Sequence, residues 1–204
     1  MLSAEFLLTS LAVVLVPGTG VIYTISTGLV HRWKASLAAA LGCTAGILPH
    51  LTASILGLSA ILHISARVFT VIKFAGALYL LYLAWGMWRD TGSLKLDRDQ
   101  PKRNAGQIAL KGILINILNP KLTLFFFAFL PLFVSPAAGS VTAQMIGLSA
   151  IFMGMTLVIF AVYGILASAI SKTLIQSPKA LRRMQRSFAL IIAGLAAKLA
   201  LSEQ

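Results

Sequence analysis

Acidic residues are nearly absent from this 204-residue chain. Only 5 aspartates and glutamates oppose 17 lysines and arginines, and charged residues make up 11% of the sequence, against about 25% in an ordinary soluble protein. No acidic residue lies between Glu5 and Asp90, or between Asp99 and Glu203. A site for a strongly cationic solute inside those stretches would lack the carboxylate that normally compensates a desolvated cation.

Cysteine and the motifs of common enzymes are also scarce. The single cysteine, Cys43, excludes a disulfide within the chain, and no cysteine–histidine cluster indicates a metal site. The sequence has no nucleotide-binding glycine loop, no His-Glu-x-x-His and no Gly-x-Ser-x-Gly motif. We therefore expect no metal, no cofactor and no enzymatic activity.

Apolar residues dominate instead, at 58% of the sequence with a mean hydropathy of +0.91. A membrane-spanning helix needs about 20 mostly apolar residues. The first stretch lacks the basic start of a signal peptide and is too long for a signal core, so we expect it to remain as a span. The sequence predicts an all-α integral membrane protein, a single membrane domain over residues 1–204 with about six transmembrane helices: 4–28, 36–62, 67–88, 110–134, 141–171 and 185–202.

The net charge of +12 is concentrated in three connectors between these segments. Thirteen of the 17 lysines and arginines lie in residues 29–35, 89–111 and 172–186. Six spans place all three connectors on one side, which the positive-inside rule identifies as the cytoplasm. A five-span alternative would place the last two basic connectors on opposite sides of the membrane. The expected partners of these residues are anionic lipid headgroups rather than nucleic acid.

Two breaks interrupt apolar segments at nearly equivalent places in the two halves. Pro17-Gly18-Thr19-Gly20 lies in the first span and Asn119-Pro120-Lys121 in the fourth, with their prolines 103 residues apart. Paired breaks in corresponding positions indicate the binding site of a secondary transporter. Three spans per half predict two inverted three-helix repeats, the first over 1–90 and the second over 110–204, joined by a polar linker over 91–109. Gly42 and Gly147 lie 105 residues apart, close to the spacing of the prolines, and give weaker support for the repeat.

The breaks expose backbone groups that a continuous helix would bond internally. After Pro17, a half-helix presents free N–H groups to a carboxylate, while the preceding carbonyls face a cation, unless the proline makes only an ordinary kink. A lysine at bilayer depth costs roughly 3 kcal/mol, so Lys121 is expected to turn inward unless it extends to the interface. We expect the substrate site to contain Pro17, Gly18, Thr19, Gly20, Asn116, Asn119, Pro120 and Lys121, although Asn119 could instead serve only to bond the backbone at Pro120.

A third group of candidates lies in the second and third spans. His50 is able to exchange a proton near neutral pH, or it is simply hydrogen-bonded to a neighbouring helix. We expect Lys73 and Tyr79 to line the cavity that the two breaks form, unless Lys73 extends to the interface. Gly42 and Gly46 have the small-xxx-small spacing that packs membrane helices closely.

Together these motifs resemble the LysE/RhtB family of bacterial amino-acid exporters. The matching stretches are Pro17-Gly18, Gly42-x-x-x-Gly46 with His50, Lys73-Phe-Ala-Gly76-Ala-Leu-Tyr79, and Lys111-Gly112-x-x-x-Asn116-x-x-Asn119-Pro120-Lys121. The resemblance covers essentially the whole chain. It implies a multi-pass protein of the bacterial inner membrane that expels amino acids, usually driven by the proton-motive force.

Two positions depart from the family pattern. Thr19 replaces a proline that is common there, and Ile47 stands where many members have an aspartate. The second departure makes His50 the alternative proton site.

We therefore expect a secondary transporter that exports amino acids, or similar small metabolites with a carboxylate and a neutral side chain. A six-helix channel is the first alternative, although the paired Asn-Pro-Ala half-helices of aquaporin-like pores are missing. A membrane-embedded enzyme or lipid-handling protein is the second, although the chain shows no nucleophile–base pair. The sequence leaves open whether the protein forms a homo-oligomer.

Overall fold

The computed structural model describes residues 3–61 and 104–169, together with isolated positions between 74 and 89 and between 186 and 197. Every regular element of this part is helical, as expected. The α-helices are α1 (Ala4–Leu15), α2 (Thr19–Ala45), α3 (Leu48–Ile61), α5 (Ala105–Ile117), α6 (Pro120–Leu124) and α7 (Val141–Ala169); between the last two lie a π-helix, η1 (Phe125–Phe129), and the 3-10 turns η2 (Leu130–Phe133) and η3 (Pro136–Ala138). Apart from those isolated positions, the predicted spans 67–88 and 185–202 fall outside the described residues, as do Lys73 and Tyr79.

The first predicted span consists of two helices separated at the Pro-Gly break. The hydroxyl of Ser3 caps the start of α1, accepting a hydrogen bond from the amide of Phe6 at 3.1 Å. The helix ends at Leu15, and α2 begins at Thr19 after an extended Gly18. Proline has no amide hydrogen to continue the helical ladder, so the break follows from the sequence.

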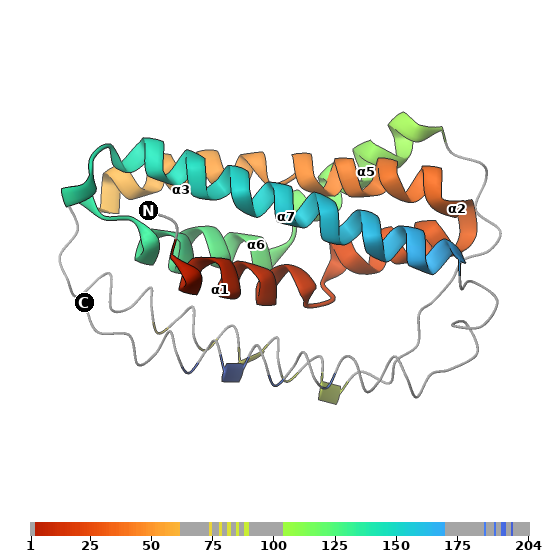
Figure 1. The fold of residues 1–204 in the computed structure, drawn as a ribbon, viewed down its shortest axis with the longest axis horizontal. Coiled ribbons are helices and arrows are strands. Elements are labelled where there is room, and N and C mark those ends of the chain that lie inside the picture. Colours follow the sequence, from red (N-terminus) through yellow and green to blue (C-terminus); the bar gives the residue numbers. More distant parts are fainter. Residues whose placement is uncertain are drawn as a thin grey trace.

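The helix α2 folds back on itself at Arg32, where the backbone leaves the helical region (φ 70°, ψ 178°). The sulfur of Cys43 lies 3.8 Å from the carbonyl oxygen of Gly20, whereas 23 residues of straight helix would separate them by about 35 Å. The two limbs therefore run antiparallel and side by side (Figure 1). Their junction falls in the basic connector predicted between the first two spans.

The second break bends the chain between α5 and α6. Asn104 and Gln107 form a reciprocal capping box at the start of α5. This helix starts inside the segment 91–109 that was predicted as polar linker, because the capping box sets its start five residues before the expected span. After Ile117 the chain turns, and Asn119 caps α6. The axes before and after the break differ by 52°.

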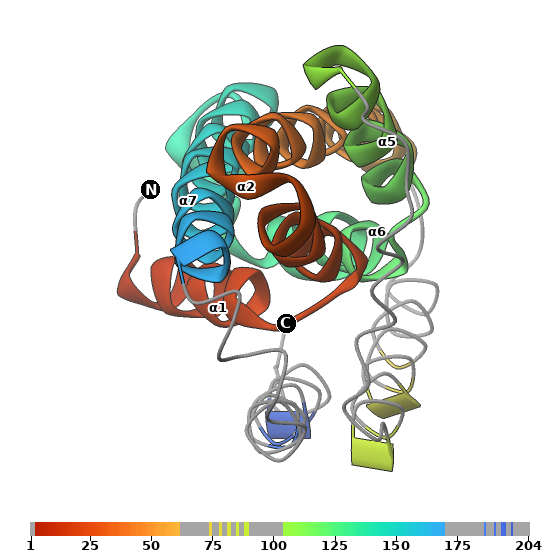
Figure 2. The ribbon, with the colours of Figure 1, turned by 90° about the vertical axis from the view of Figure 1, so that its right-hand side faces the viewer.

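Helix α2 lies at the centre of the described part and makes its most extensive contacts with α7 and α5 (Figure 2). Glycines allow the close approach: a side chain on Gly28 would meet the backbone of Gly164, and one on Gly42 would meet that of Ala109. Small residues at such crossings let helix backbones pack closely in a membrane. The limbs of α2 are thus packed closely against α7 and α5.

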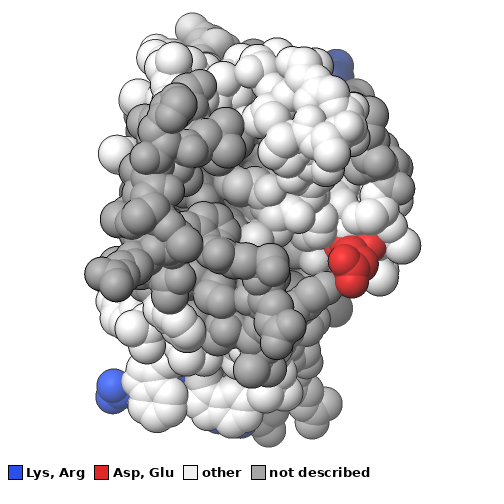
Figure 3. Space-filling model, turned by 90° about the vertical axis from the view of Figure 1, so that its left-hand side faces the viewer, with Lys and Arg blue, Asp and Glu red and all other residues white. Residues whose placement is uncertain are grey.

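The outer face of the described part is apolar. Leu118 is 80% exposed, Leu8 67% and Val158 63%, and uncharged side chains cover nearly all of the described surface in the view of Figure 3. Val141–Ala169 is long and apolar enough to cross a membrane. The stretch Thr19–Gly57, which folds back at Arg32, passes the same test of length and composition, as does the bent pair Ala105–Ile117 with Pro120–Phe133 taken together. A surface of this kind is matched to lipid rather than to water.

The described helix ends that border the three basic connectors lie at the same end of the molecule. The fold-back of α2, the start of α5 and the end of α7 all lie at the right of Figure 1, whereas the η3 turn and the start of α7 lie at the left. The segment Ser135–Ser140, predicted as the turn between the fourth and fifth spans, contains η3 and precedes α7.

Candidate functional site

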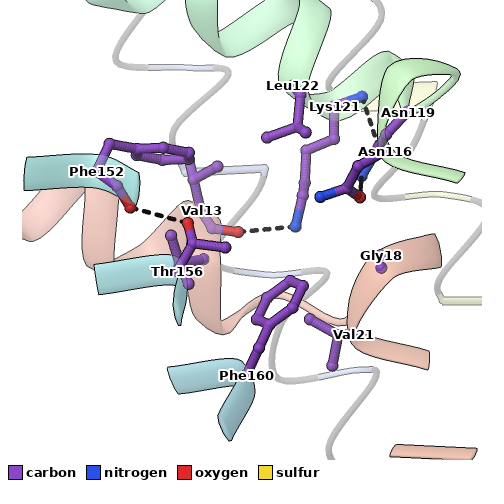
Figure 4. A pocket seen from close by; sticks show the side chains of 12 residues that line it. Val13, Gly18, Val21, Asn116, Asn119, Lys121, Leu122, Phe152, Thr156 and Phe160 are labelled. Atoms are coloured by element: carbon purple, nitrogen blue, oxygen red, sulfur yellow. Dashed lines mark hydrogen bonds between the residues drawn. The ribbon is translucent and has the colours of Figure 1, made fainter. Parts of the chain in front are cut away.

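The two breaks meet at one small cavity. It is about 10 Å³ in volume, which gives room for about one water molecule. Five of the predicted site residues line it, namely Gly18, Gly20, Asn116, Asn119 and Lys121 (Figure 4). The remaining lining residues are Val13, Val14, Val21, Leu122, Phe152, Thr156 and Phe160.

Lys121 turns inward and bonds to the C-terminal end of α1. Its side chain is only 9% exposed, and its ammonium donates to the carbonyl oxygens of Val13 at 2.8 Å and Val16 at 2.9 Å. In a continuous helix the Val13 carbonyl would accept from the amide of residue 17, which is a proline without that hydrogen. The lysine of the second break therefore satisfies the carbonyl that the first break leaves open.

The glycines of the first break make room for this contact. A Cβ on Gly18 would lie 3.3 Å from both Cε and Nζ of Lys121. A Cβ on Gly20 would lie 2.5 Å from the Oδ1 atom of Asn116. Gly18 also leaves the N-terminus of α2 without a side-chain cap, so the positive end of that helix dipole faces the cavity beside the lysine.

Asn116 and Asn119 bond to the protein itself in this structure. The Nδ2 of Asn116 donates to the carbonyl of Cys43 at 2.6 Å, and its Oδ1 accepts from Asn119 at 3.3 Å. The Oδ1 of Asn119 accepts from the backbone amide of Lys121 at 3.1 Å. The two amides thus link the end of α2 to the second break and hold the lysine backbone in place.

His50 bonds to the second break from α3. Its Nε2 lies 2.9 Å from the carbonyl oxygen of Asn116, and its Nδ1 lies 3.3 Å from the hydroxyl of Thr123. A carbonyl only accepts, so Nε2 carries a hydrogen and donates it. In a continuous helix the Asn116 carbonyl would accept from the nitrogen of residue 120, which is a proline without that hydrogen. Here it accepts from the amide of Asn119 at 3.0 Å and from His50. The histidine does not line the cavity.

At a third proline, Pro131, a side chain from another helix likewise bonds the carbonyl that the proline leaves without a backbone donor. In the π-helix η1 the amide of Leu130 bonds to the carbonyl of Phe125, and the next bond in that register would need an amide hydrogen on Pro131. The hydroxyl of Ser54, one helical turn after His50 on α3, donates to the open carbonyl of Phe126 at 2.6 Å instead. Each of these breaks is therefore completed by a polar side chain from a different part of the chain, as membrane depth requires.

The other sequence candidates lie apart from the cavity. Thr19 is exposed, and Pro17 and Pro120 shape the breaks without lining the cavity. Gly42 and Gly46 lie against α5, facing Ala109 and Ile113, whereas a side chain on Gly147 would meet nothing within 4 Å. Gly42 and Gly147, which the repeat would make equivalent, therefore have different surroundings.

Several residues at the site were not predicted. Thr156 lines the cavity, with its hydroxyl bonded to the carbonyl of Phe152 in its own helix at 2.8 Å. Tyr163 donates from its phenol to the carbonyl of Leu15 at 3.1 Å. Polar groups within the apolar segment 141–169 were the only feature of the sequence that could have identified these two residues. No feature of the sequence identified the apolar residues that line the cavity.

Electrostatically, the site is a buried cation between backbone dipoles. None of the described lining residues is acidic, and no group of three or more metal-binding side chains occurs in the part of the chain described. The carbonyls of α1 and the N-terminus of α2 meet at the first break, so opposite dipole ends flank the lysine. Such a site can hold both a positive and a negative group.

A model of the family of LysE type translocators matches residues 11–203. The chain belongs to this family. Among relatives of this translocator, an uncharacterized membrane protein of Vibrio cholerae is 31% identical over 93% of this chain and 91% of its own. A homoserine/homoserine lactone efflux protein of Salmonella typhimurium is 30% identical over 90% and 88%, and a threonine efflux protein of Escherichia coli K12 is 31% identical over 72% of each chain. No solved structure matches this translocator.

Proposed function

We propose that this translocator is a secondary transporter that exports amino acids with neutral side chains across the bacterial inner membrane. The observation that carries the proposal is the buried ammonium of Lys121, held between the two breaks by the carbonyls of Val13 and Val16. A cavity with room for about one water is too small for an amino acid. The described conformation is therefore closed, and transport requires the two broken helices to separate.

The charges of the cavity support a neutral side chain. Arginine or lysine as substrate would bring a second cation beside Lys121, and none of the described lining residues supplies an acidic partner. One of the relatives is named for homoserine and homoserine lactone and another for threonine, and none of these compounds has a charged side chain. The substrate carboxylate meets Lys121 and the N-terminus of α2, near Gly18 and Gly20.

We place proton coupling at His50. With Nε2 donating to the carbonyl of Asn116, Nδ1 is the ring atom able to gain or lose a proton, next to the hydroxyl of Thr123. Ile47, which occupies the position of the family's frequent aspartate, is fully buried in apolar surroundings and has no proton to exchange. A proton on His50 would change the bonds at the second break directly.

The proposed architecture has six spans, in two inverted repeats, in a single transport domain. The positive-inside rule then places the end of the molecule with the three basic connectors in the cytoplasm. Relative rocking of the two repeats about the breaks would alternate access to Lys121. No covalent chemistry is assigned to this site.

Counterflow in proteoliposomes tests the proposal. Vesicles containing purified protein and loaded with unlabelled homoserine or threonine should accumulate the labelled amino acid, whereas lysine and arginine should not compete. Lys121→Ala should abolish exchange, while Lys111→Ala should retain it, because Lys111 lies on α5 beside Tyr23 and away from the cavity. Normal exchange by a folded Lys121→Ala protein would refute the site, and equal transport of lysine would refute the selectivity.

A further inference from the structure

We propose that the carbonyl pair at the end of α1, which holds the Lys121 ammonium in this structure, is the binding site for the primary ammonium group of the transported amino acid. Lys121 leaves this pair when substrate enters and takes up the substrate carboxylate. The inference rests on the proposed function and assigns a specific contact to each end of the substrate.

The geometry shows that this place binds an ammonium group. A single nitrogen lies 2.8 Å from the carbonyl oxygen of Val13 and 2.9 Å from that of Val16, both within the range of strong charge-assisted hydrogen bonds. Val13 lies in the last turn of the 12-residue helix α1 and Val16 is its C-cap residue. At this end of a helix the dipole favours a cation. Pro17 prevents the chain from satisfying the Val13 carbonyl by itself.

The ammonium of an amino acid has the same chemistry as that of lysine. Both are R–NH3⁺ groups with three hydrogens to donate, so a substrate ammonium can replace Lys121 at the same two oxygens without leaving them unpaired. The phenol of Tyr163 already donates to the neighbouring carbonyl of Leu15, so the Val13 and Val16 oxygens are the ones that the ammonium of Lys121 holds.

Lys121 already lies near the place proposed for the substrate carboxylate. Its Nζ is 3.3 Å from where a Cβ of Gly18 would be, so the absent side chain leaves the ammonium next to the uncapped start of α2. A carboxylate bound there would contact both the lysine and the positive dipole end. On entry, the substrate ammonium and carboxylate would thus come to lie between the ammonium of Lys121 and the carbonyls of Val13 and Val16.

This exchange keeps every charge paired only for a zwitterion. A carboxylate without an ammonium would draw Lys121 away and leave buried carbonyls unpaired. An amine without a carboxylate would displace Lys121 and leave its charge unpaired. Unpaired buried groups of either kind are costly, so the site should discriminate strongly against molecules with only one of the two groups.

Competition against labelled threonine in wild-type proteoliposomes tests the discrimination. Threonine, 3-hydroxybutyrate (threonine without its ammonium) and 1-amino-2-propanol (threonine without its carboxylate) differ in little else. We expect half-inhibition by the last two to need at least about tenfold more compound than by threonine, equivalent to about 1.4 kcal/mol. Equal inhibition by 3-hydroxybutyrate would overturn the ammonium site. Absence of any uptake of labelled threonine and homoserine would instead refute the proposed function.

Chemical rescue tests the carbonyl pair without transport. In Lys121→Ala the two oxygens are unpaired, so ethylammonium should raise the thermal unfolding temperature of the detergent-solubilised variant. Tetramethylammonium, which has no N–H to donate, should not, and neither ion should stabilise the wild type. Equal effects of both ions on the variant, or no effect of ethylammonium, would overturn the inference. If the variant does not fold, the competition experiment on the wild type decides alone.

Discussion

Lys121 and His50 each bond a carbonyl whose ordinary partner would be a proline nitrogen. Removing Lys121 leaves the Val13 carbonyl without a donor, at a cost of about 1–3 kcal/mol. Removing His50 takes one of two donors from the Asn116 carbonyl, which still accepts from the amide of Asn119 at 3.0 Å. Alanine at these positions therefore mixes a loss of stability with a loss of function. A substitution that keeps the donor and removes the titratable group separates the two.

His50→Gln is such a substitution. The side-chain amide of glutamine is able to donate to the carbonyl of Asn116, but it cannot take up a proton at neutral pH. We expect the variant to unfold near the wild-type temperature, whereas His50→Ala unfolds several degrees lower. In inside-out vesicles, exchange of threonine without a pH gradient should persist in His50→Gln, and accumulation driven by a pH gradient should be lost. Accumulation at the wild-type level would remove His50 from proton coupling.

At the scale of elements, the first break and Lys121 are expected to be energetically coupled. Pro17→Ala restores an amide hydrogen that can bond the Val13 carbonyl, so the lysine becomes less necessary for stability. We predict that Lys121→Ala costs less in the Pro17→Ala background than in the wild type, with a coupling energy of about 0.5–3 kcal/mol. Unfolding of the four proteins of this double-mutant cycle in detergent measures it. Strict additivity would show that the lysine does not substitute for the missing amide.

Two glycines provide a matched test of helix packing. Gly42→Ala should lower the unfolding temperature clearly, because the added methyl group would meet the backbone of Ala109. Gly147→Ala should leave it unchanged or raise it slightly, because nothing lies within 4 Å and alanine favours helix by up to about 1 kcal/mol. Similar effects of both substitutions on unfolding monitored by circular dichroism would contradict the close contact between α2 and α5.

The sequence showed where the helices break more reliably than what the breaks contact. Pro17 and Pro120 locate both breaks, because proline removes a donor whatever its surroundings. The contact between Lys121 and Val13 joins residues 108 apart in the chain, and no local pattern encodes it. Likewise, the proposal that His50 bonds a neighbouring helix was open at the level of sequence, but its partner, the Asn116 carbonyl, depends on tertiary packing. The π-helix η1 and the capping role of Ser54 had no recognisable signal.

For the molecule as a whole, the inverted repeat remains a prediction, because only isolated positions of the spans 67–88 and 185–202 are among the described residues. The two breaks nevertheless share a principle. In each, the carbonyl four residues before the proline accepts from a basic side chain of another segment. The donor is a lysine ammonium at one break and a histidine imidazole at the other. The two breaks therefore differ in chemistry, as the separate roles proposed for Lys121 and His50 require.

Membrane orientation gives a test at the same scale. The start of α5 and the turn before α7 lie at opposite ends of the described part (Figure 1), and Ala105 and Ser140 are exposed there. In a Cys43→Ser background, a cysteine at position 140 should react with a membrane-impermeant maleimide in intact cells. A cysteine at position 105 should react only after the membrane is permeabilised, because the basic connectors favour the cytoplasm. Labelling of both positions from the same side would contradict the spanning arrangement, and the reverse pattern would place the basic connectors outside and contradict the proposed orientation.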